Sequence, residues 1–178
     1  MDVGLGGEQL AAIDELVTLA HELGVPVWLR GGWAIDFFLG RLTRDHADID
    51  WFALAEDGQR LADSLIGRGF QDVTTTPPGQ QIDLVRGNIE HGIGLVKLGQ
   101  QSEPLVAGGP WAGEPWPDGM LNGPVGWIGK VSAHVISPLA QIEIKQMTPT
   151  WNPQLKRRQK DLDDIAAIRL GLSQSPPS

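Results

Sequence analysis

The sequence predicts an α+β fold, because helical and strand-like segments alternate in the first half and helices return at the C-terminal end. The chain has 178 residues, of which 41% are hydrophobic and 20% are charged. These values are typical of a globular chain that buries one core. We therefore expect one domain, or one catalytic domain with a small appendage.

The N-terminal segments have the clearest patterns. Apolar residues recur at helical spacing over 10–23, and Gly24 ends that helix. A buried strand at 27–29 then runs into Gly31-Gly32. The pattern continues with a short helix at 33–39 closed by Gly40, a strand at 49–54 and a helix at 57–66.

A β-rich region and a long loop occupy the middle of the chain. Residues 81–86 and 89–98 are predicted strands, and Gly87-Asn88 between them is typical of a hairpin turn. Residues 99–126 contain seven Gly, five Pro and two Trp, so we expect a loop folded over the surface. A strand-like pattern resumes at 127–136.

Two helices are predicted at the C-terminal end. Ser137-Pro138 and Asn152-Pro153 each place a capping residue before a proline, and the second helix carries an apolar stripe as far as Leu172. These patterns divide the chain into a core at 1–136, which includes the loop at 99–126, C-terminal helices at 137–172 and a frayed tail at 173–178.

Composition narrows the classes of function. The net charge of −8 repels nucleic-acid phosphates and suits a cationic small molecule better, so we expect no nucleic-acid partner. The absence of cysteine excludes disulfides, thiolate zinc sites and cysteine nucleophiles. No apolar run approaches the roughly 18 residues of a membrane span, and the N-terminus lacks a signal-peptide pattern. We expect a cytoplasmic monomer or homodimer with no membrane partner.

Two acidic residues and two glycines form the most informative pattern. Asp48 and Asp50 stand two apart at the head of a strand, so their carboxylates point to the same face. Carboxylates this close repel each other unless a cation lies between them, and Mg²⁺ prefers oxygen ligands. Gly31-Gly32 joins a strand to a helix, where backbone N–H groups can approach an anion closely. A phosphate cradle beside an acid pair is what metal-assisted nucleotidyl transfer requires.

These residues resemble the core motif of the antibiotic-modifying nucleotidyltransferases, in the DNA polymerase β-like superfamily. The resemblance is to the aminoglycoside 2″-adenylyl type and the lincosamide type. It is strong over about 27–54, which includes Gly-Gly-Trp-Ala-Ile-Asp at 31–36 and Thr-Arg-x-His-x-Asp-x-Asp at 43–50. It is weaker at the C-terminal end, where Lys145 and the Lys-Asp pair at 160–161 resemble the family's closing helices.

The resemblance implies a mixed sheet flanked by helices, with the C-terminal helices closing the cleft. It implies Mg²⁺ bound by Asp48 and Asp50, and a nucleoside triphosphate such as ATP with its phosphates near Gly31 and Gly32. A hydroxyl of a cationic small molecule, an aminoglycoside by resemblance, would attack the α-phosphorus and release pyrophosphate. That reaction confers antibiotic resistance in the family.

The third carboxylate of the family is missing from its expected place. That place is on the second strand of the hairpin, where residues 92–96 contain no acid. If Gly87-Asn88 is a two-residue turn, Asp83 pairs with Gly92 and Glu90 pairs with Val85, so both acids project to the same face. We favour Asp83 as the third acid and place Glu90 second.

Other side chains have more than one interpretation. Arg44 either faces phosphate or pairs with Asp36 or Asp48, whereas His46 is expected to hold its neighbours by hydrogen bonds. Lys145 is a candidate contact to the triphosphate, which the resemblance supports. Glu114 and Asp118 in the loop could meet a cationic acceptor, and Trp111 or Trp116 could stack on its rings.

Two other classes of function stay open. One is a non-catalytic nucleotide- or ligand-binding protein that kept the fold and lost the third acid. The other is a protein-modifying nucleotidyltransferase or the antitoxin-like half of a toxin pair. Whether Asp83 or Glu90 reaches the metal discriminates the first from an enzyme, and whether the cleft is a closed pocket or an open groove discriminates the second.

Overall fold

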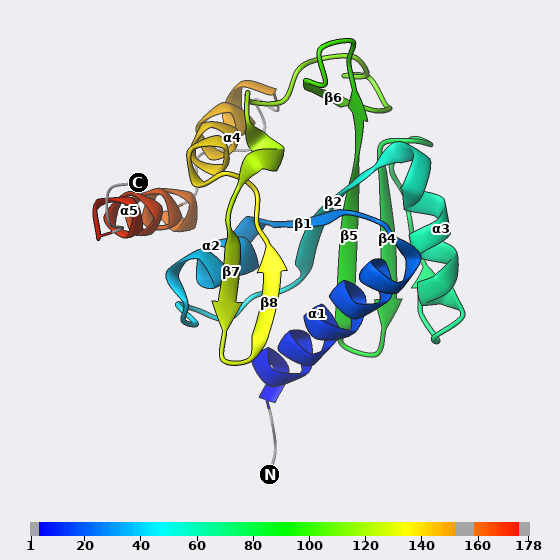
Figure 1. Cartoon of the computed structure of the whole chain (residues 1–178), viewed down its shortest axis with the longest axis horizontal. Helices are drawn as coiled ribbons and strands as arrows, with labels where there is room; N and C mark the ends of the chain where they lie inside the picture. Colours follow the sequence, from blue (N-terminus) through cyan, green and yellow to red (C-terminus); the bar gives the residue numbers. More distant parts are fainter. Residues whose placement is uncertain (1–3, 152–158, 175–178) are drawn as a thin grey trace.

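The architecture is a mixed β-sheet with helices on both faces (Figure 1). The computed structural model describes residues 4–151 and 159–174. The main sheet has the order β1-β2-β5-β4-β3, with β6 paired to β5. Its strands are β1 (Val27–Arg30), β2 (Ile49–Leu54), β3 (Gln71–Asp72), β4 (Gln81–Arg86), β5 (Ile89–Leu98) and β6 (Pro104–Val106). The α+β fold class predicted from the sequence is confirmed.

Helices surround this sheet, and a separate two-stranded hairpin lies beside it. The helices are α1 (Gly4–Leu23), α2 (Gly31–Leu39), α3 (Ala55–Ile66), α4 (Pro138–Trp151) and α5 (Gln159–Gln174), with a 3-10 turn η1 (Met120–Asn122). The hairpin consists of β7 (Val125–Ile128) and β8 (Val131–His134). Among the described residues, no helix is both long enough and apolar enough to cross a lipid bilayer.

Two separate apolar clusters cover the two faces of the sheet. On one face, α1 and α3 pack against Trp51 of β2 and Ile93 of β5. On the other face, Phe52 of β2 packs with Met120 of η1 and with α4. A third cluster joins α2 to α4 and α5. Because side chains alternate along a strand, β2 contributes to both faces with adjacent residues.

Several boundaries predicted from the sequence are confirmed. The strands at 49–54, 81–86 and 89–98 have the expected limits. Gly40 ends α2 in the left-handed conformation, with φ of 75°, as expected for a helix C-terminus. The hairpin turn at Gly87-Asn88 sets the pairing of Asp83 with Gly92.

The region after residue 99 differs from the prediction. The expected single strand at 127–136 is wrong, because Gly129 has a φ of +57° and lets the chain reverse into the hairpin β7–β8. The predicted loop at 99–126 contains β6 and η1. Residues 173–174 belong to α5 and not to a frayed tail. The predicted helix start at Asn152-Pro153 and the tail at 175–178 lie outside the described residues.

Candidate active site

Four residues from four strands lie in one row across the sheet. Arg30 of β1 pairs with Asp50 of β2, Asp50 pairs with Gly92 of β5, and Gly92 pairs with Asp83 of β4. Directly paired residues project to the same face of a sheet. The sheet topology therefore brings together two carboxylates that are 33 positions apart in the chain.

Gly92 places no side chain between the two carboxylates, which lie close on either side of it. A Cβ atom placed on Gly92 would lie 3.0 Å from Asp50 Oδ1 and 3.3 Å from Asp83 Oδ1. Gln81 donates a hydrogen bond to the same Asp83 oxygen, with a distance of 2.7 Å. Asp83 is thus held beside the position where the family resemblance predicts an acid, as the strand register inferred from the sequence requires.

The carboxyl group of Asp50 is the electrostatic centre of this row. Burial raises its pKa, and the negative charges of Asp48, Asp83 and Glu90 raise it further, to about 6. The positive charge of Arg30 opposes this rise. Asp48 and Glu90 are exposed, whereas Asp50 and Asp83 are partly buried. An ionised Asp50 at neutral pH therefore repels its neighbours, and a bound cation would relieve that repulsion.

The two glycines at the start of α2 serve different purposes. Gly31 has a φ of +69°, and a Cβ there would lie 3.0 Å from Asp50 Oδ2, so glycine lets the helix begin against the carboxylate. A Cβ on Gly32 would collide with the imidazole ring of His46. Gly32 is therefore required for packing against His46, in addition to its predicted role in phosphate binding.

The loop between α2 and β2 is built around the buried Asp36. His46 Nε2 lies 2.6 Å from Asp36 Oδ2, and the backbone N–H of Thr43 donates to Asp36 Oδ1. Gln9 donates to the carbonyl oxygen of His46, and the His46 ring packs on Trp33. His46 thus holds its neighbours by hydrogen bonds, as expected from the sequence.

Two cations from different elements meet one carboxylate of α5. Arg44 Nη2 lies 3.1 Å from Asp164 Oδ2, and Lys145 Nζ lies 3.0 Å from the same oxygen. Burial raises the pKa of Asp164, but the hydrogen bond from Arg44 and the charge of Lys145 outweigh it and lower the pKa. The sequence suggested Asp36 or Asp48 as ion-pair partners of Arg44, but the partner in the structure is Asp164.

A polar cavity of about 450 Å³ gathers most of the predicted site residues. Its walls come from the start of α2, the loop before β2, and the helices α4 and α5. The predicted residues that line it are Gly31, Gly32, Arg44, Asp48, Asp50 and Lys145. Asp83 and Glu90 are absent from this lining and lie on the adjoining strands. The helices α4 and α5 therefore form one wall of the cleft.

Two residues of this cleft were missed by the sequence analysis. Arg30 lines the cavity from the end of β1, and Gln141 of α4 donates a 2.7 Å hydrogen bond to the carbonyl oxygen of Gly31. The position of Arg30, directly after a buried leucine in a short strand, places it on the opposite face of that strand. No sequence signal points to Gln141, because its role depends on how α4 packs.

The carboxylates fit a hard cation that keeps part of its solvent and substrate shell. Among the described residues, no group of three or more His, Asp or Glu side chains could hold a metal ion alone. Mg²⁺ is commonly bound by one or two carboxylates together with waters and substrate phosphates. Asp48 and Asp50, both in the lining of the polar cavity, provide such a partial site.

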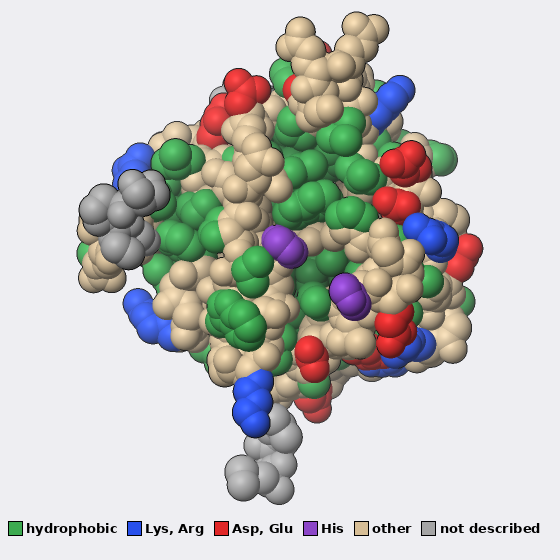
Figure 2. Space-filling view, in the orientation of Figure 1, with side chains coloured by type: hydrophobic (Ala, Val, Ile, Leu, Met, Phe, Trp, Pro, Cys, Tyr) green, Lys and Arg blue, Asp and Glu red, His purple; other side chains and the backbone are tan. Residues whose placement is uncertain are grey.

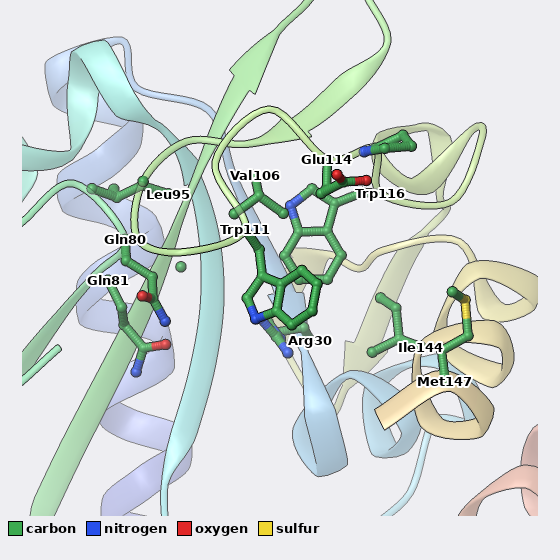
Figure 3. A pocket seen from close by; sticks show the side chains of 13 residues that line it. Arg30, Gln80, Gln81, Leu95, Val106, Trp111, Glu114, Trp116, Ile144 and Met147 are labelled. Atoms are coloured by element: carbon green, nitrogen blue, oxygen red, sulfur yellow. The ribbon is translucent and has the colours of Figure 1, made fainter. Parts of the chain in front are cut away.

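A second cavity, of about 510 Å³, adjoins the first on the same face of the sheet. Arg30 and Ile144 line both cavities. Its other walls come from the loop after β6 and from α4 (Figure 3). A third hollow, lined by His21 and His134, has no carboxylate among the described residues that line it. It lies between α1 and the β7–β8 hairpin, on the face that Figure 2 shows.

Comparison with known proteins identifies a family that matches this sequence. The sequence model of the aminoglycoside-2''-adenylyltransferase family matches residues 12–104, just over half of the chain. The chain is 50% identical over 42 residues to curated 2''-aminoglycoside nucleotidyltransferases of Klebsiella pneumoniae and Escherichia coli. That aligned segment spans 24% of this chain and 24% of each relative.

Solved structures share the fold along most of the chain. The crystal structure of ANT(2")-Ia in complex with adenylyl-2"-tobramycin has a TM-score of 0.74 at 21% identity, covering 93% of this chain and 90% of that one. The lincomycin-bound lincosamide adenylyltransferase LnuA has a TM-score of 0.68 at 20% identity, covering 87% of this chain and 92% of that one. At these identities the comparison establishes the fold alone.

Proposed function

Because the chain belongs to the aminoglycoside-2''-adenylyltransferase family, we propose that it transfers a nucleoside monophosphate to a hydroxyl group of a small-molecule antibiotic. The donor is a nucleoside triphosphate, with ATP the simplest choice, and the second product is pyrophosphate. The observation that carries this proposal is the in-register row of Asp50, Gly92 and Asp83 beside the helix start at Gly31.

The polar cavity supplies what a triphosphate needs. The backbone N–H groups at the start of α2 can donate hydrogen bonds to an anion, and the helix dipole favours negative charge there. Arg44, Lys145 and Lys160 add cationic side chains to the same cavity. Arg44 and Lys145 are already anchored by Asp164, so they are held in place before a phosphate arrives.

Asp48 and Asp50 are the proposed Mg²⁺ ligands. When bound, Mg²⁺ would neutralise charge on the phosphate oxygens during the transfer. Asp50 is partly buried on β2, where it pairs with Arg30 on one side and Gly92 on the other. The repulsion that raises the pKa of Asp50 favours capture of a cation by this pair.

Asp83 is the proposed acceptor of the proton from the attacking hydroxyl. The hydroxyl oxygen forms a bond to the α-phosphorus, the bond from that phosphorus to the bridging oxygen breaks, and pyrophosphate leaves. The hydrogen bond from Gln81 holds the Asp83 carboxylate beside Gly92, on the same face of the sheet as Asp50. Glu90 is more exposed and acts on Asp50 through its charge, so we assign it a weaker, electrostatic contribution.

Release of pyrophosphate tests the proposal directly. Labelled nucleoside triphosphates with Mg²⁺ are incubated with pooled antibiotics that include tobramycin and lincomycin. Asp48→Asn and Asp50→Asn are each expected to lower turnover by at least about 10³-fold, since a lost metal ligand removes several kcal/mol of charge stabilisation. The matched control Asp63→Asn, an exposed site on α3, should leave turnover unchanged.

The outcomes separate the enzyme from the binding protein. Turnover that survives Asp50→Asn at saturating triphosphate contradicts the metal assignment. Nucleotide binding without turnover of any acceptor would instead favour the non-catalytic function. Loss of Mg²⁺ by chelation should abolish turnover, and its return should restore it.

A further inference from the structure

The guanidinium group of Arg30 is a partly buried cation at the end of β1. It forms no ion pair and donates no hydrogen bond to any part of the chain that the structure describes. Burial lowers the pKa of Arg30, and the negative charges of Asp50 and Asp48 act against this change from a distance. A cation that loses hydration without a hydrogen-bonded anion beside it costs free energy. Its presence in the cleft therefore points to an anion that arrives with a ligand.

Aromatic side chains hold the guanidinium in place. Its central carbon lies 4.3 Å from the centre of the Phe52 ring and 5.7 Å from that of the Trp116 ring. A Cβ atom on Gly94 would lie 3.3 Å from Arg30 Nη1, so a larger residue there would crowd the group. A cation–π contact leaves the N–H donors of a guanidinium available, and their planar fork matches the oxygens of a phosphoryl group.

The other cations of the polar cavity are in a different state. Arg44 and Lys145 both form ion pairs with Asp164. Lys160 also lines the cavity, but it is exposed, so solvent satisfies its ammonium group. Arg30 thus combines a partly desolvated charge with donors that no other residue uses.

Arg30 lies where the two cavities meet. It lines both of them, and Figure 3 shows it among the side chains around the second cavity. Because Arg30 pairs with Asp50 across β1 and β2, the two side chains share one face of the sheet. A cation beside a proposed Mg²⁺ ligand repels the metal ion unless an anion lies between the two positive charges. The phosphoryl group that is transferred would be such an anion.

We propose that Arg30 is a catalytic residue that donates hydrogen bonds to the non-bridging oxygens of the α-phosphoryl group during its transfer. This inference rests on the proposed nucleotidyl transfer. The acceptor oxygen bonds to the α-phosphorus, the bond from that phosphorus to the bridging oxygen breaks, and pyrophosphate leaves with the bonding electrons. Arg30 gives up no proton. It stabilises the negative charge that the non-bridging oxygens carry in the transition state.

Kinetics of pyrophosphate release test the role in transfer. Arg30→Met removes the charge and keeps an unbranched side chain beside Phe52. It should lower kcat by at least about 10²-fold, whereas the KM for the triphosphate should rise by less than about 10-fold. Arg30→Lys keeps the charge without the planar fork, so its loss in kcat should be about 10-fold. The matched control Arg169→Met, at an exposed position of α5, should leave both parameters unchanged.

Calorimetric binding to the full chain with Mg²⁺ tests the contact without turnover. AMP carries only the phosphate that is transferred, and pyrophosphate carries only the two that leave. Arg30→Met should weaken AMP binding by about 10-fold and change pyrophosphate binding by less than about 2-fold. Arg44→Met should do the opposite, because Arg44 lines only the polar cavity of the two.

Two further measurements distinguish this contact from a packing role. In Arg30→Ala, guanidinium ions at millimolar concentration should restore part of kcat, and ammonium ions should restore less. The melting temperature of Arg30→Met should equal or exceed that of the wild type, since a partly buried charge without an ion pair is removed. A lower melting temperature together with no rescue of Arg30→Ala would assign Arg30 to packing against Phe52 and overturn the inference.

The remaining outcomes separate this inference from the proposed function. Pyrophosphate release that is unchanged in Arg30→Met contradicts the inference and leaves the proposed function standing. Equal losses of AMP and pyrophosphate binding in Arg30→Met also contradict it, because Arg30 would then attract anions without regard to position. Conversely, AMP binding that depends on Arg30, without pyrophosphate release for any acceptor, contradicts the proposed transfer and supports the phosphate contact.

Discussion

The two faces of the sheet are built from alternate residues of the same strands, yet their chemistry is opposite. On the face covered by α1 and α3, Ile49, Trp51 and Ala53 of β2 are fully buried in the main core. On the other face, the intervening residue Asp50 lines the polar cavity, and Phe52 packs against Trp116 in the wall of the second cavity. A period of two therefore lets one strand stabilise the fold and carry the site at once.

Each face also holds a titratable group whose pKa burial shifts strongly. His91 lies on the core face, where Trp51 Nε1 donates to its Nδ1 atom at 3.0 Å, and burial lowers its pKa to about 4. Asp50 lies on the cleft face, where burial and three carboxylates raise its pKa to about 6. Both groups are thus driven toward their neutral forms. The difference is that Asp50 faces a cavity in which a cation can restore its charge, and His91 faces packed apolar side chains.

The largest expected effect is a difference in kcat between variants of two carboxylates on the cleft face. Asp83→Ala should lower kcat by at least about 10²-fold, the loss expected for a positioned proton acceptor. Glu90→Ala should cost much less, because Glu90 is exposed and acts on Asp50 only through its charge. Steady-state kinetics of pyrophosphate release at saturating triphosphate measures both.

The order of these two variants decides the assignment. A larger loss for Glu90→Ala would move the proton acceptor to Glu90. If both variants keep wild-type kcat, an acid from another segment serves the reaction. Asp83→Asn keeps the size of the side chain, so it separates loss of the carboxylate charge from loss of the contact with Gln81.

The next prediction concerns the pH dependence of stability that His91 causes on the core face. Because the pKa of folded His91 is about 4 and its ordinary value is 6.5, the unfolded chain binds a proton that the folded chain refuses between these values. The free energy of unfolding is therefore unaffected by His91 titration above pH 6.5, and it decreases as the pH falls from 6.5 toward 4. Between pH 7 and 4.5 the loss should be about 2.5 kcal/mol.

Denaturant unfolding at several pH values measures this loss. His91→Gln keeps an oxygen for the Trp51 donor but does not titrate, so the difference between wild type and variant isolates the imidazole. The free energy of unfolding of the variant should depend less steeply on pH over this interval. Equal slopes for both proteins would show that His91 accepts a proton in the folded state.

The smallest effect concerns the cost of the charge on Asp50. A carboxyl whose pKa rises on folding destabilises the chain when it is ionised, so its cost is present above pH 6 and vanishes as the pH falls toward 3.8. Asp50→Asn should raise the free energy of unfolding at pH 7 by about 1–2 kcal/mol, since solvent in the cavity reduces the full linkage value. Thermal unfolding without Mg²⁺ measures the gain, and saturating Mg²⁺ should stabilise the wild type more than the variant. A lower melting temperature for the variant would contradict the repulsion.

Local sequence patterns were sufficient for the elements that carry the site. An apolar segment that follows a polar stretch predicted the strand at 49–54, and Gly87-Asn88 predicted the register of the hairpin. That register alone places Asp83 opposite Gly92, and the structure confirms the pairing. Both predictions rest on interactions between residues close in the chain, for which turn geometry and the period of two are enough.

Local patterns failed where the outcome depended on backbone conformation or on packing at a distance. The hairpin β7–β8 was missed because the positive φ of Gly129 divides what reads as one strand. The pairing of Arg44 with Asp164 joins residues that are 120 positions apart, so no spacing rule can predict it. Gln141 reaches Gly31 only because α4 packs beside α2.

The sequence by itself determined the candidate residues for the chemistry: Asp48 and Asp50 at a strand head, Gly31 at a helix start and Asp83 on a hairpin. The tertiary structure decided how they meet. Parallel pairing of β2 with β5 places Gly92 between Asp50 and Asp83, and the fold of the loop after β6 against α4 makes an apolar cavity beside them. The physical reason is that strand periodicity acts between near neighbours, whereas the shape and charge of a cavity depend on walls from distant segments.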